Sequence, residues 1–349
     1  MNKDIDTQNM FGSIWNFPDN IIEAMKIGSS IVLQNNFSKV EKVIVAGMGG
    51  SAIGGDVTGA LIENELDIPF IVIRGYQLPN WVDSRTLVIC SSYSGDTEET
   101  LSAFDDAQSR NALICSITTG GALVDKCLSS GCDVINIPDG LQPRAALAFS
   151  FVPMLYLLKK VGKISLESIS WLSKAAKLLK DVREGYSIDD QSNPTWSLAQ
   201  KIKYRLPIIY TGSERLNPVA IRLKGQLCEN GKMLAYNNSL PEMNHNEIEG
   251  WENNKELFEQ YYIIWLKDKD DHGRVKLRQK ATRKILRKNG VKQSVLKMNE
   301  KSFSERFLHM IHYGDWLSYW CAIAHGSDPG LVEKIIQIKK KLASETWCR

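Results

Sequence analysis

Residues 43–56 read VIVAGMGGSAIGGD, a β-branched apolar run that ends in a glycine-rich turn. The small residues after the turn lead into a helix, so the stretch predicts a strand, a tight turn and a helix N-terminus. Backbone N–H groups and the positive end of the helix dipole meet there, which suits a phosphate group. Glycines are equally expected where a helix packs tightly against a strand. Both interpretations stay open, and the motif does not say whether a phosphate would belong to a nucleotide, a dinucleotide or a sugar.

Short apolar runs alternate with longer amphipathic segments along the rest of the chain. Strands are predicted at 42–46, 70–74, 86–91, 112–117, 133–137, 207–212, 232–237, 260–266 and 291–298. Helices are predicted at 18–35, across 141–180, and at 216–229, 273–289, 303–325 and 329–343. Strands that alternate with helices predict parallel sheets covered by helices on both faces. The expected fold is therefore α/β, with two tandem, doubly wound, three-layer αβα domains, although the second half has no copy of GMGGS.

A polar stretch at 183–197, REGYSIDDQSNPTWS, is the best candidate for a linker between the two halves. The predicted organisation is an N-terminal helical segment at 1–35, a first domain at 36–182, a linker at 183–200 and a second domain at 201–349. Ligands of open parallel sheets bind at the carboxyl ends of the strands, so functional residues are expected there.

Composition excludes several classes of protein. The 349 residues are 43% hydrophobic and 24% charged, as in an ordinary globular protein, and a net charge of +3 is too small to argue for nucleic acid. Seven scattered cysteines, two of them (Cys90 and Cys115) inside strand-like runs, predict reduced core thiols and no zinc site. The polar N-terminus is unlike a signal peptide, and no run approaches the roughly 20 apolar residues of a membrane span. We expect a cytoplasmic protein.

Residues 267–297 contain a dozen Lys and Arg, which raises the possibility of a nucleic-acid face. No aromatic residues interleave with the basic ones, as they do on many such faces. We favour a solvated helix that turns Leu277, Ala281 and Ile285 toward the core at i, i+4 spacing.

The second functional signal is SSYSGDTEET at 91–100, which follows a predicted strand and precedes an amphipathic helix. Its hydroxyl groups predict either a second anion cradle or an elaborate helix cap. A dinucleotide site is the rival interpretation, because Gly47-x-Gly49-x-x-Ala52 fits a loose fingerprint. That scheme wants an acid at the end of the second strand, whereas Arg74 stands there, so only NADP remains open.

Together these two stretches resemble the sugar isomerase (SIS) domain, whose Ser/Thr loop holds the phosphate of a phosphosugar. The longer set of motifs is similar to the bifunctional phosphoglucose/phosphomannose isomerases: Arg74-x-Tyr76-x-Leu78-Pro79, Gln142-Pro143-Arg144-Ala145-Ala146, Asn244-His245-Asn246-Glu247, Gly314-Asp315-Trp316-Leu317-Ser318-Tyr319, and Asp328-Pro329 followed by Ile338-Lys339. This resemblance covers nearly the whole chain and makes both expected domains SIS-type.

The resemblance implies an enzyme that interconverts glucose 6-phosphate, and mannose 6-phosphate, with fructose 6-phosphate through a cis-enediol, without metal or cofactor. The implied phosphate site consists of Gly50, Ser51, Ser92, Ser94 and Thr97. The implied catalytic residues are Arg144 beside the enediolate, Glu229 as the base, His245 for ring opening, and Lys339. In the related isomerases the histidine comes from the partner subunit, so a homodimer with shared sites is implied.

One departure from the family pattern concerns the phosphate loop, where Asp96 stands in place of the Asn of many relatives. It brings a negative charge close to the implied phosphate. Two other functions stay open: another phosphosugar isomerase, and a non-catalytic phosphosugar-binding SIS protein.

Overall fold

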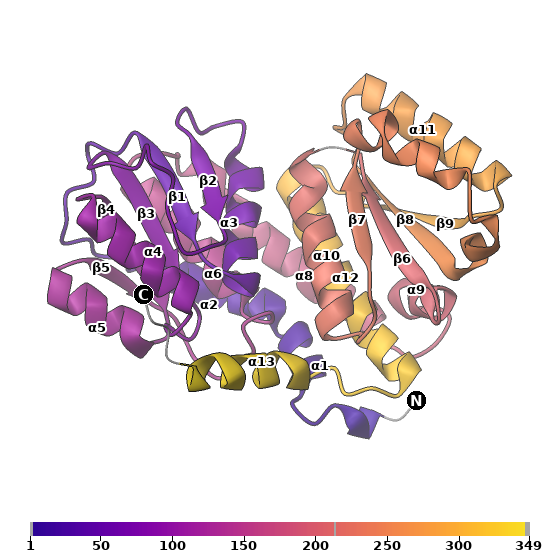
Figure 1. Cartoon of the computed structure of the whole chain (residues 1–349), viewed down its shortest axis with the longest axis horizontal. Coiled ribbons are helices and arrows are strands. Elements are labelled where there is room, and N and C mark those ends of the chain that lie inside the picture. Colours follow the sequence, from indigo (N-terminus) through magenta and orange to yellow (C-terminus); the bar gives the residue numbers. More distant parts are fainter. Residues whose placement is uncertain (1–2, 213, 346–349) are drawn as a thin grey trace.

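The computed structural model describes residues 3–212 and 214–345, so parts of the predicted segments 1–35 and 201–349 lie outside the described residues. Within them the chain forms two parallel sheets that lie side by side with helices between them (Figure 1). The first sheet has the order β2-β1-β3-β4-β5, from Phe70–Ile73, Lys42–Ala46, Thr86–Ser91, Leu113–Thr118 and Asp133–Asn136. The second has the order β7-β6-β8-β9, from Tyr236–Ser239, Leu206–Thr211, Tyr261–Lys267 and Lys292–Lys297. The predicted α/β fold with two parallel sheets is confirmed.

The helices of the first half are α1 (Met10–Trp15), α2 (Phe17–Ser29), α3 (Gly49–Ile62), α4 (Glu98–Ser109), α5 (Gly121–Ser130), α6 (Leu147–Lys160), α7 (Glu167–Ser170) and α8 (Leu172–Tyr186). Those of the second half are α9 (Pro194–Ile202), α10 (Asn217–Glu229), α11 (Gly273–Lys288), α12 (Phe303–His325) and α13 (Glu333–Ser344).

Several predicted boundaries are wrong. The helix predicted at 18–35 ends at Ser29, because the segment after it runs to β5, where the Asp133 carboxylate accepts the backbone N–H groups of Gln34 and Asn35. The helix predicted across 141–180 is interrupted after α6, where Gly162 has a positive φ of 73°. The strand predicted at 232–237 is shifted to 236–239, because Lys232 adopts a left-handed backbone conformation that a strand cannot contain.

The predicted linker at 183–200 is largely helical: α8 continues to Tyr186 and α9 begins at Pro194. Asn193 caps α9 by accepting the N–H groups of Thr195 and Trp196, and its amide also donates to the carbonyl oxygens of Tyr186 and Ile188. Asn193 is completely buried. The turn between the two helices is therefore a packed part of the structure.

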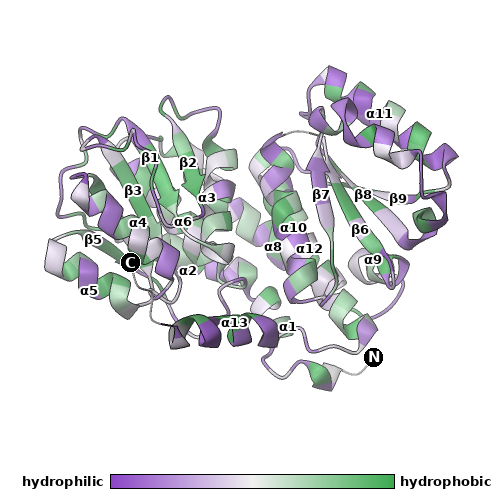
Figure 2. Cartoon of the chain, viewed as in Figure 1, coloured by the Kyte–Doolittle hydropathy of each residue, from purple (hydrophilic) through white to green (hydrophobic). Residues whose placement is uncertain are grey.

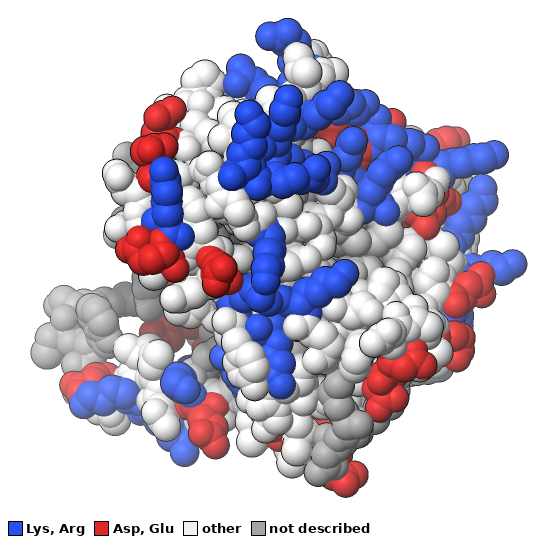
Figure 3. Space-filling view, turned by 90° about the vertical axis from the view of Figure 1, so that its right-hand side faces the viewer, with Lys and Arg blue, Asp and Glu red and all other residues white. Residues whose placement is uncertain are grey.

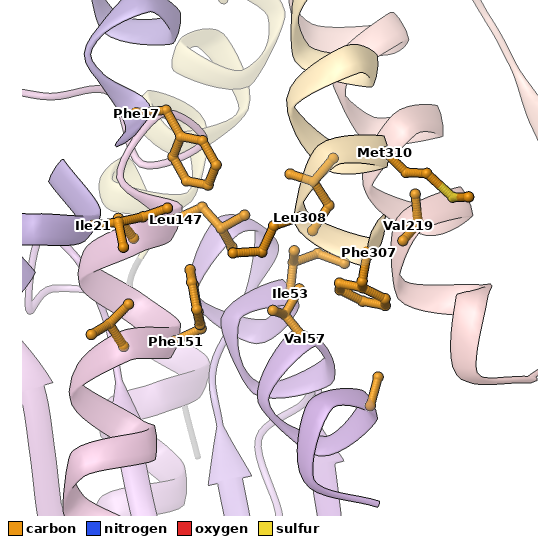
Figure 4. Packing of buried hydrophobic residues seen from close by; sticks show 14 of the residues in the cluster. Phe17, Ile21, Ile53, Val57, Leu147, Phe151, Val219, Phe307, Leu308 and Met310 are labelled. Carbon is orange, nitrogen blue, oxygen red and sulfur yellow. The ribbon is translucent and has the colours of Figure 1, made fainter. Parts of the chain in front are cut away.

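One continuous hydrophobic core joins the two sheets. Figure 4 shows Phe17 and Ile21 of α2, Leu147 and Phe151 of α6, Ile53 and Val57 of α3, Val219 of α10, and Phe307, Leu308 and Met310 of α12. Helix α12 is buried on all sides from Arg306 to Ile323, as expected for a helix between two layers. In Figure 2 hydrophobic residues gather in the inner strands β1, β3, β6 and β8 and in these central helices, whereas β7 and α13 are largely hydrophilic.

The orientation predicted for the basic helix is also wrong. Leu277, Ala281 and Ile285 of α11 are exposed, and the buried residues are Gln279, Thr282 and Leu286. The buried polar side chains are bonded: the Gln279 amide donates to the Leu266 carbonyl oxygen at 3.1 Å. The hydrogen bonds of Gln279 and Thr282, together with the burial of Leu286 in a hydrophobic cluster, therefore decide which face of this helix packs inward.

Candidate functional site

The glycine turn lies at the carboxyl edge of the first sheet and supports a neighbouring loop. A Cβ atom on Gly50 would lie 2.5 Å from the Pro143 carbonyl oxygen, so only glycine permits the 142–146 loop to approach. Similarly, a Cβ atom on Gly54 would lie 2.4 Å from the Ser150 Cβ atom. Close packing thus explains two of the glycines. The N-cap residue of α3, Met48, supplies no side-chain hydrogen bond to the first turn of the helix.

The Ser/Thr loop lies beside this turn because β1 and β3 pair in parallel. The Ser51 hydroxyl accepts the Tyr93 backbone N–H at 3.2 Å, and the Tyr93 hydroxyl accepts the Leu141 N–H at 3.0 Å. The Ser92 hydroxyl donates to Thr97 Oγ1 at 2.9 Å. Ser51 and Ser92 are buried and hold the loop in shape, whereas Ser94 is exposed and Thr97 partly exposed.

The Asp96 carboxylate is held away from the glycine turn, on the α5 side of the loop. It accepts the backbone N–H of Ala122 at 2.9 Å, in the first turn of α5. The positive end of that helix dipole faces the carboxylate and offsets part of its charge. Asp96 therefore caps a neighbouring helix.

Arg144 is 5% exposed and is fixed by contacts with the second half of the chain. Its Nε donates to Asn230 Oδ1 at 2.6 Å, and its Nη2 donates to the carbonyl oxygens of Pro329 and Gly330 at 2.8 and 2.7 Å. Its Nη1 lies 3.7 Å from Glu229 Oε2. Burial lowers the pKa of the Arg144 guanidinium, and the Glu229 carboxylate opposes this effect. The group stays charged because its ordinary pKa is very high.

A buried polar network supports Arg144 from behind, and two of its members come from the Gly314–Tyr319 motif. Ser318 Oγ accepts the Asn230 Nδ2 hydrogen bond at 3.0 Å. The Asp315 carboxylate accepts from Arg222 Nε and Nη2 at 3.1 and 2.8 Å, and Arg222 Nη2 also donates to the Arg144 carbonyl oxygen at 3.1 Å. Burial raises the pKa of the Asp315 carboxyl, and the Arg222 charge opposes this. The motif therefore positions the loop and the guanidinium of Arg144.

Glu229 is the last residue of α10 and opens onto a groove of about 550 Å³. The groove runs between the end of α10 and the start of α13, and its lining includes Glu229, Lys232, Asp328, Leu331, Val332 and Lys334. The Glu229 side chain is 33% exposed, so the carboxylate reaches solvent in the groove. The arrangement combines an accessible carboxylate with a fixed buried cation, as proton transfer beside a developing oxyanion requires.

Lys232 is a residue of this groove that the sequence interpretation missed. Its Nζ donates to the carbonyl oxygens of Glu229 and Leu331, and so joins the end of α10 to the segment before α13. Burial, and then the charge of Arg144, lowers its pKa. The sequence offered one signal, since Lys232 ends a Glu-Asn-Gly-Lys segment that begins at Glu229.

His245 lies far from Glu229 within one chain. Helix α10 starts at the carboxyl edge of the second sheet and ends at its amino edge, whereas His245 follows the carboxyl end of β7, in the short helix Glu242–His245. The 13 residues of α10 separate the two edges by about 20 Å. The loop itself is anchored, because the Glu247 carboxylate accepts from Tyr210, Tyr236 and Asn238. His245 is exposed on this loop.

Lys339 does not line the groove either. It lies in the middle of α13, on a helix that is exposed along its described length (Figure 1). The apolar residues of α13 are exposed as well: Ile335 by 40%, Ile338 by 62% and Leu342 by 39%. One chain therefore brings together Arg144, Glu229 and the phosphate loops, and leaves His245 and Lys339 apart from them.

Among the described residues, no group of three or more His, Cys, Asp and Glu side chains is arranged to hold a metal ion. No helix among residues 3–212 and 214–345 has the length and apolar character needed to cross a bilayer. The six described cysteines are free thiols, and four of them are buried.

Two parallel α/β units, a glycine turn and a Ser/Thr loop at adjacent strand ends define the SIS class of phosphosugar proteins. The fold agrees with a solved structure, the C-terminal domain of glucosamine-fructose-6-phosphate aminotransferase from Francisella tularensis, at a TM-score of 0.73 and 17% identity over 95% of this chain and 100% of that chain. Residues 191–342 match the family model described as the bacterial phospho-glucose isomerase C-terminal SIS domain.

Sequence relatives narrow the class to one family. The chain is 42% identical to the bifunctional phosphoglucose/phosphomannose isomerase of Caldicellulosiruptor bescii, over 96% of this chain and 99% of that protein. It is 37% identical to the protein of the same name from Aquifex aeolicus, over 86% of this chain and 90% of that protein. The chain belongs to the bifunctional phosphoglucose/phosphomannose isomerase family.

Proposed function

We propose that this protein interconverts glucose 6-phosphate, and mannose 6-phosphate, with fructose 6-phosphate. The observation that carries the proposal is the Glu229 carboxylate at the mouth of a groove, 3.7 Å from the buried guanidinium of Arg144. The Arg144 loop is in turn packed on the glycine turn through Gly50 and Pro143. The names of the relatives from Caldicellulosiruptor bescii and Aquifex aeolicus agree with this activity.

In the proposed mechanism the substrate phosphate binds Gly50, Ser51, Ser92, Ser94 and Thr97. The buried Ser51 and Ser92 shape this site, and the accessible hydroxyls of Ser94 and Thr97 contact the phosphate. Glu229 takes the proton from one of the carbons C1 and C2 and returns it to the other. Arg144 stabilises the negative charge that develops on the enediolate oxygen, since its guanidinium is positioned before the reaction starts. Glucose 6-phosphate and mannose 6-phosphate give the same enediol, so reprotonation on either face of C2 would serve both substrates.

We further propose a homodimer in which His245 of one chain opens the sugar ring in the site of the other. Two observations support this: His245 and Glu229 lie at opposite edges of the second sheet, and α13 exposes an apolar face in the single chain. Lys339 on that helix would assist proton transfer at the sugar hydroxyls once the partner covers α13. The domain limits 36–182 and 201–349, independence of metal ions and a cytoplasmic location complete the proposal.

The activity is tested by supplying glucose 6-phosphate and mannose 6-phosphate separately and measuring the fructose 6-phosphate formed, with and without EDTA. We expect turnover of both sugars in either buffer. Binding without turnover would favour a non-catalytic phosphosugar-binding protein, and turnover of a different phosphosugar alone would favour another isomerase. Loss of activity in EDTA that zinc restores would contradict the metal-free mechanism.

Shared sites are tested by mixing two inactive variants, Glu229→Gln and His245→Ala. A mixed dimer contains one site with both intact residues if His245 acts across the interface. Random mixing of the subunits then restores about a quarter of the wild-type activity, because half of the dimers are mixed and each has one intact site. No recovery, with the mixed dimer shown to form, would contradict the shared site.

A further inference from the structure

Helix α11 concentrates positive charge far more than the chain as a whole does. Its 16 residues, GRVKLRQKATRKILRK, include eight Lys and Arg and neither Asp nor Glu. Because the whole chain carries +3 and this helix +8, all other residues together carry −5. Figure 3 shows the Lys and Arg side chains gathered over one face of the molecule. Such asymmetry attracts a polyanion to one face and repels it from the others.

The inward packing of α11 directs these charges toward solvent. Gln279, Thr282 and Leu286 take up the buried side, and the Thr282 hydroxyl accepts the Asn244 amide at 2.9 Å. The opposite side exposes a set of cations: Arg274, Lys280, Lys284, Arg287 and Lys288. A groove of about 510 Å³ continues this face between α11 and the end of β8, lined by Lys267, Lys276, Leu277, Gln279, Lys280 and Arg283.

The lysines of α11 form a row with a regular spacing. Lys276, Lys280, Lys284 and Lys288 follow one another at i, i+4, so the cations repeat every 6 Å or so along the helix axis. Like charges at this spacing repel one another within the helix. A partner with regularly spaced negative charges would remove this repulsion, and the phosphates of a nucleic-acid strand have a spacing of the same order.

Of the possible polyanionic partners, the outer face of α11 is best suited to the phosphate backbone of a nucleic-acid duplex. Single strands are bound through aromatic side chains that stack on the bases, and α11 and β9 contain no aromatic residue. Helices that insert into anionic membranes bury a broad apolar face with large side chains. The exposed apolar residues of α11 are Leu277, Ala281 and Ile285, a narrow stripe with Lys and Arg on both sides. The phosphates of a duplex can be bound by Lys and Arg side chains alone.

We propose that the outer face of α11 binds duplex nucleic acid through its phosphates, without reading the sequence. This departs from the expectation of no nucleic-acid partner, which rested on the small net charge of the whole chain and on the absence of aromatic residues among the basic ones. The charged outer face of α11 is separate from Glu229 and Arg144, because α11 lies on the outer side of the second sheet and α10 and α12 on the inner side (Figure 1). The inner face of α11 instead supports the His245 loop, through the hydrogen bond between Thr282 and Asn244.

The test uses the full chain and a fluorescent 20-base-pair duplex, with binding followed by anisotropy between 50 and 200 mM salt. The variant Lys280→Gln/Lys284→Gln/Lys288→Gln removes three exposed cations of α11. A matched control, Lys39→Gln/Lys174→Gln/Lys177→Gln, removes the same charge from exposed positions elsewhere. Both variants should retain wild-type isomerase activity, which shows that they are folded.

We expect wild-type dissociation constants of about 1–100 μM at 150 mM salt, as for nonspecific binding. In the α11 variant the slope of log K against log salt should become less negative by about 2.7, since each lost phosphate contact contributes about 0.9. In the control variant this slope should become less negative by less than half of that amount. Three outcomes would overturn the proposal. They are an equal change of slope in both variants, no binding of the duplex at 50 mM salt, and binding only to vesicles that contain phosphatidylglycerol.

Discussion

Ser318→Ala tests whether the buried network behind Arg144 positions that side chain for function. Ser318 is fully buried, and its hydroxyl accepts the Asn230 amide at 3.0 Å. Asn230 is also fully buried, and its other amide atom, Oδ1, accepts from Arg144 Nε at 2.6 Å. The substitution therefore leaves one buried donor of Asn230 unsatisfied and loosens one of the three anchors of Arg144.

The stability effect follows from the unsatisfied donor. A buried donor without a partner costs about 1–3 kcal/mol. Since the unfolding entropy is about 2.1 cal/mol/K per residue, each kcal/mol lowers the melting temperature of a 349-residue chain by roughly 1–2 °C. The melting temperature of Ser318→Ala should therefore fall by about 1–5 °C.

The catalytic effect should appear in kcat. Arg144 keeps its hydrogen bonds to the Pro329 and Gly330 carbonyl oxygens, so the guanidinium is displaced and not lost. A loss of about 1.4 kcal/mol of transition-state stabilisation lowers kcat about tenfold. KM for fructose 6-phosphate should stay within about twofold, because the phosphate loops do not contact Ser318 and a displaced guanidinium affects mainly the transition state.

The matched control is Ser116→Ala, which removes another fully buried hydroxyl, one that accepts from the Cys127 thiol at 3.0 Å in the first sheet. Both variants are assayed for turnover and melted under the same conditions. We expect a stability loss in both and a kcat loss only in Ser318→Ala. If kcat falls equally in both variants, or does not fall in Ser318→Ala, the positioning role of the network is refuted.

Three further predictions concern the base, the phosphate loop and a buried histidine. Glu229→Gln should fold normally and lose turnover, because an amide cannot accept the C1/C2 proton; unchanged melting with retained activity would exclude Glu229 as the base. Ser94→Ala should raise KM for the phosphosugar more than it lowers kcat, and an unchanged KM would place the phosphate elsewhere. When the pH is lowered from 7 to 5, the unfolding free energy measured in urea titrations should fall by about 2 kcal/mol more in wild type than in His312→Phe.

The sign of the pH effect follows from the burial of His312. Desolvation lowers its pKa to about 3, against 6.5 for an exposed imidazole. Between these values the unfolded chain binds a proton that the folded chain does not, so stability falls as pH falls. Equal pH dependence in wild type and His312→Phe would show that this histidine does not titrate differently in the two states.

The local pattern of the sequence was sufficient for the class of fold. Alternating apolar runs and helical segments predicted parallel sheets, because strand and helix periodicity are properties of neighbouring residues. The resemblance to a known family also pointed to Arg144 and Glu229, which lie 3.7 Å apart in the structure. Boundaries failed where one residue changes the backbone direction, as at Gly162 and Lys232.

The tertiary structure alone decided which residues act together. The partners of Arg144 lie 86, 185 and 186 positions away in the chain. The same packing brings Lys232 into the groove and leaves His245 and Glu229 at opposite edges of the second sheet. It also decided the orientation of α11, because Gln279 bonds to the Leu266 carbonyl oxygen of β8 and Thr282 to the Asn244 amide in the short helix Glu242–His245. A sequence pattern records the period of a helix, but the groups available on its neighbours determine which face is buried.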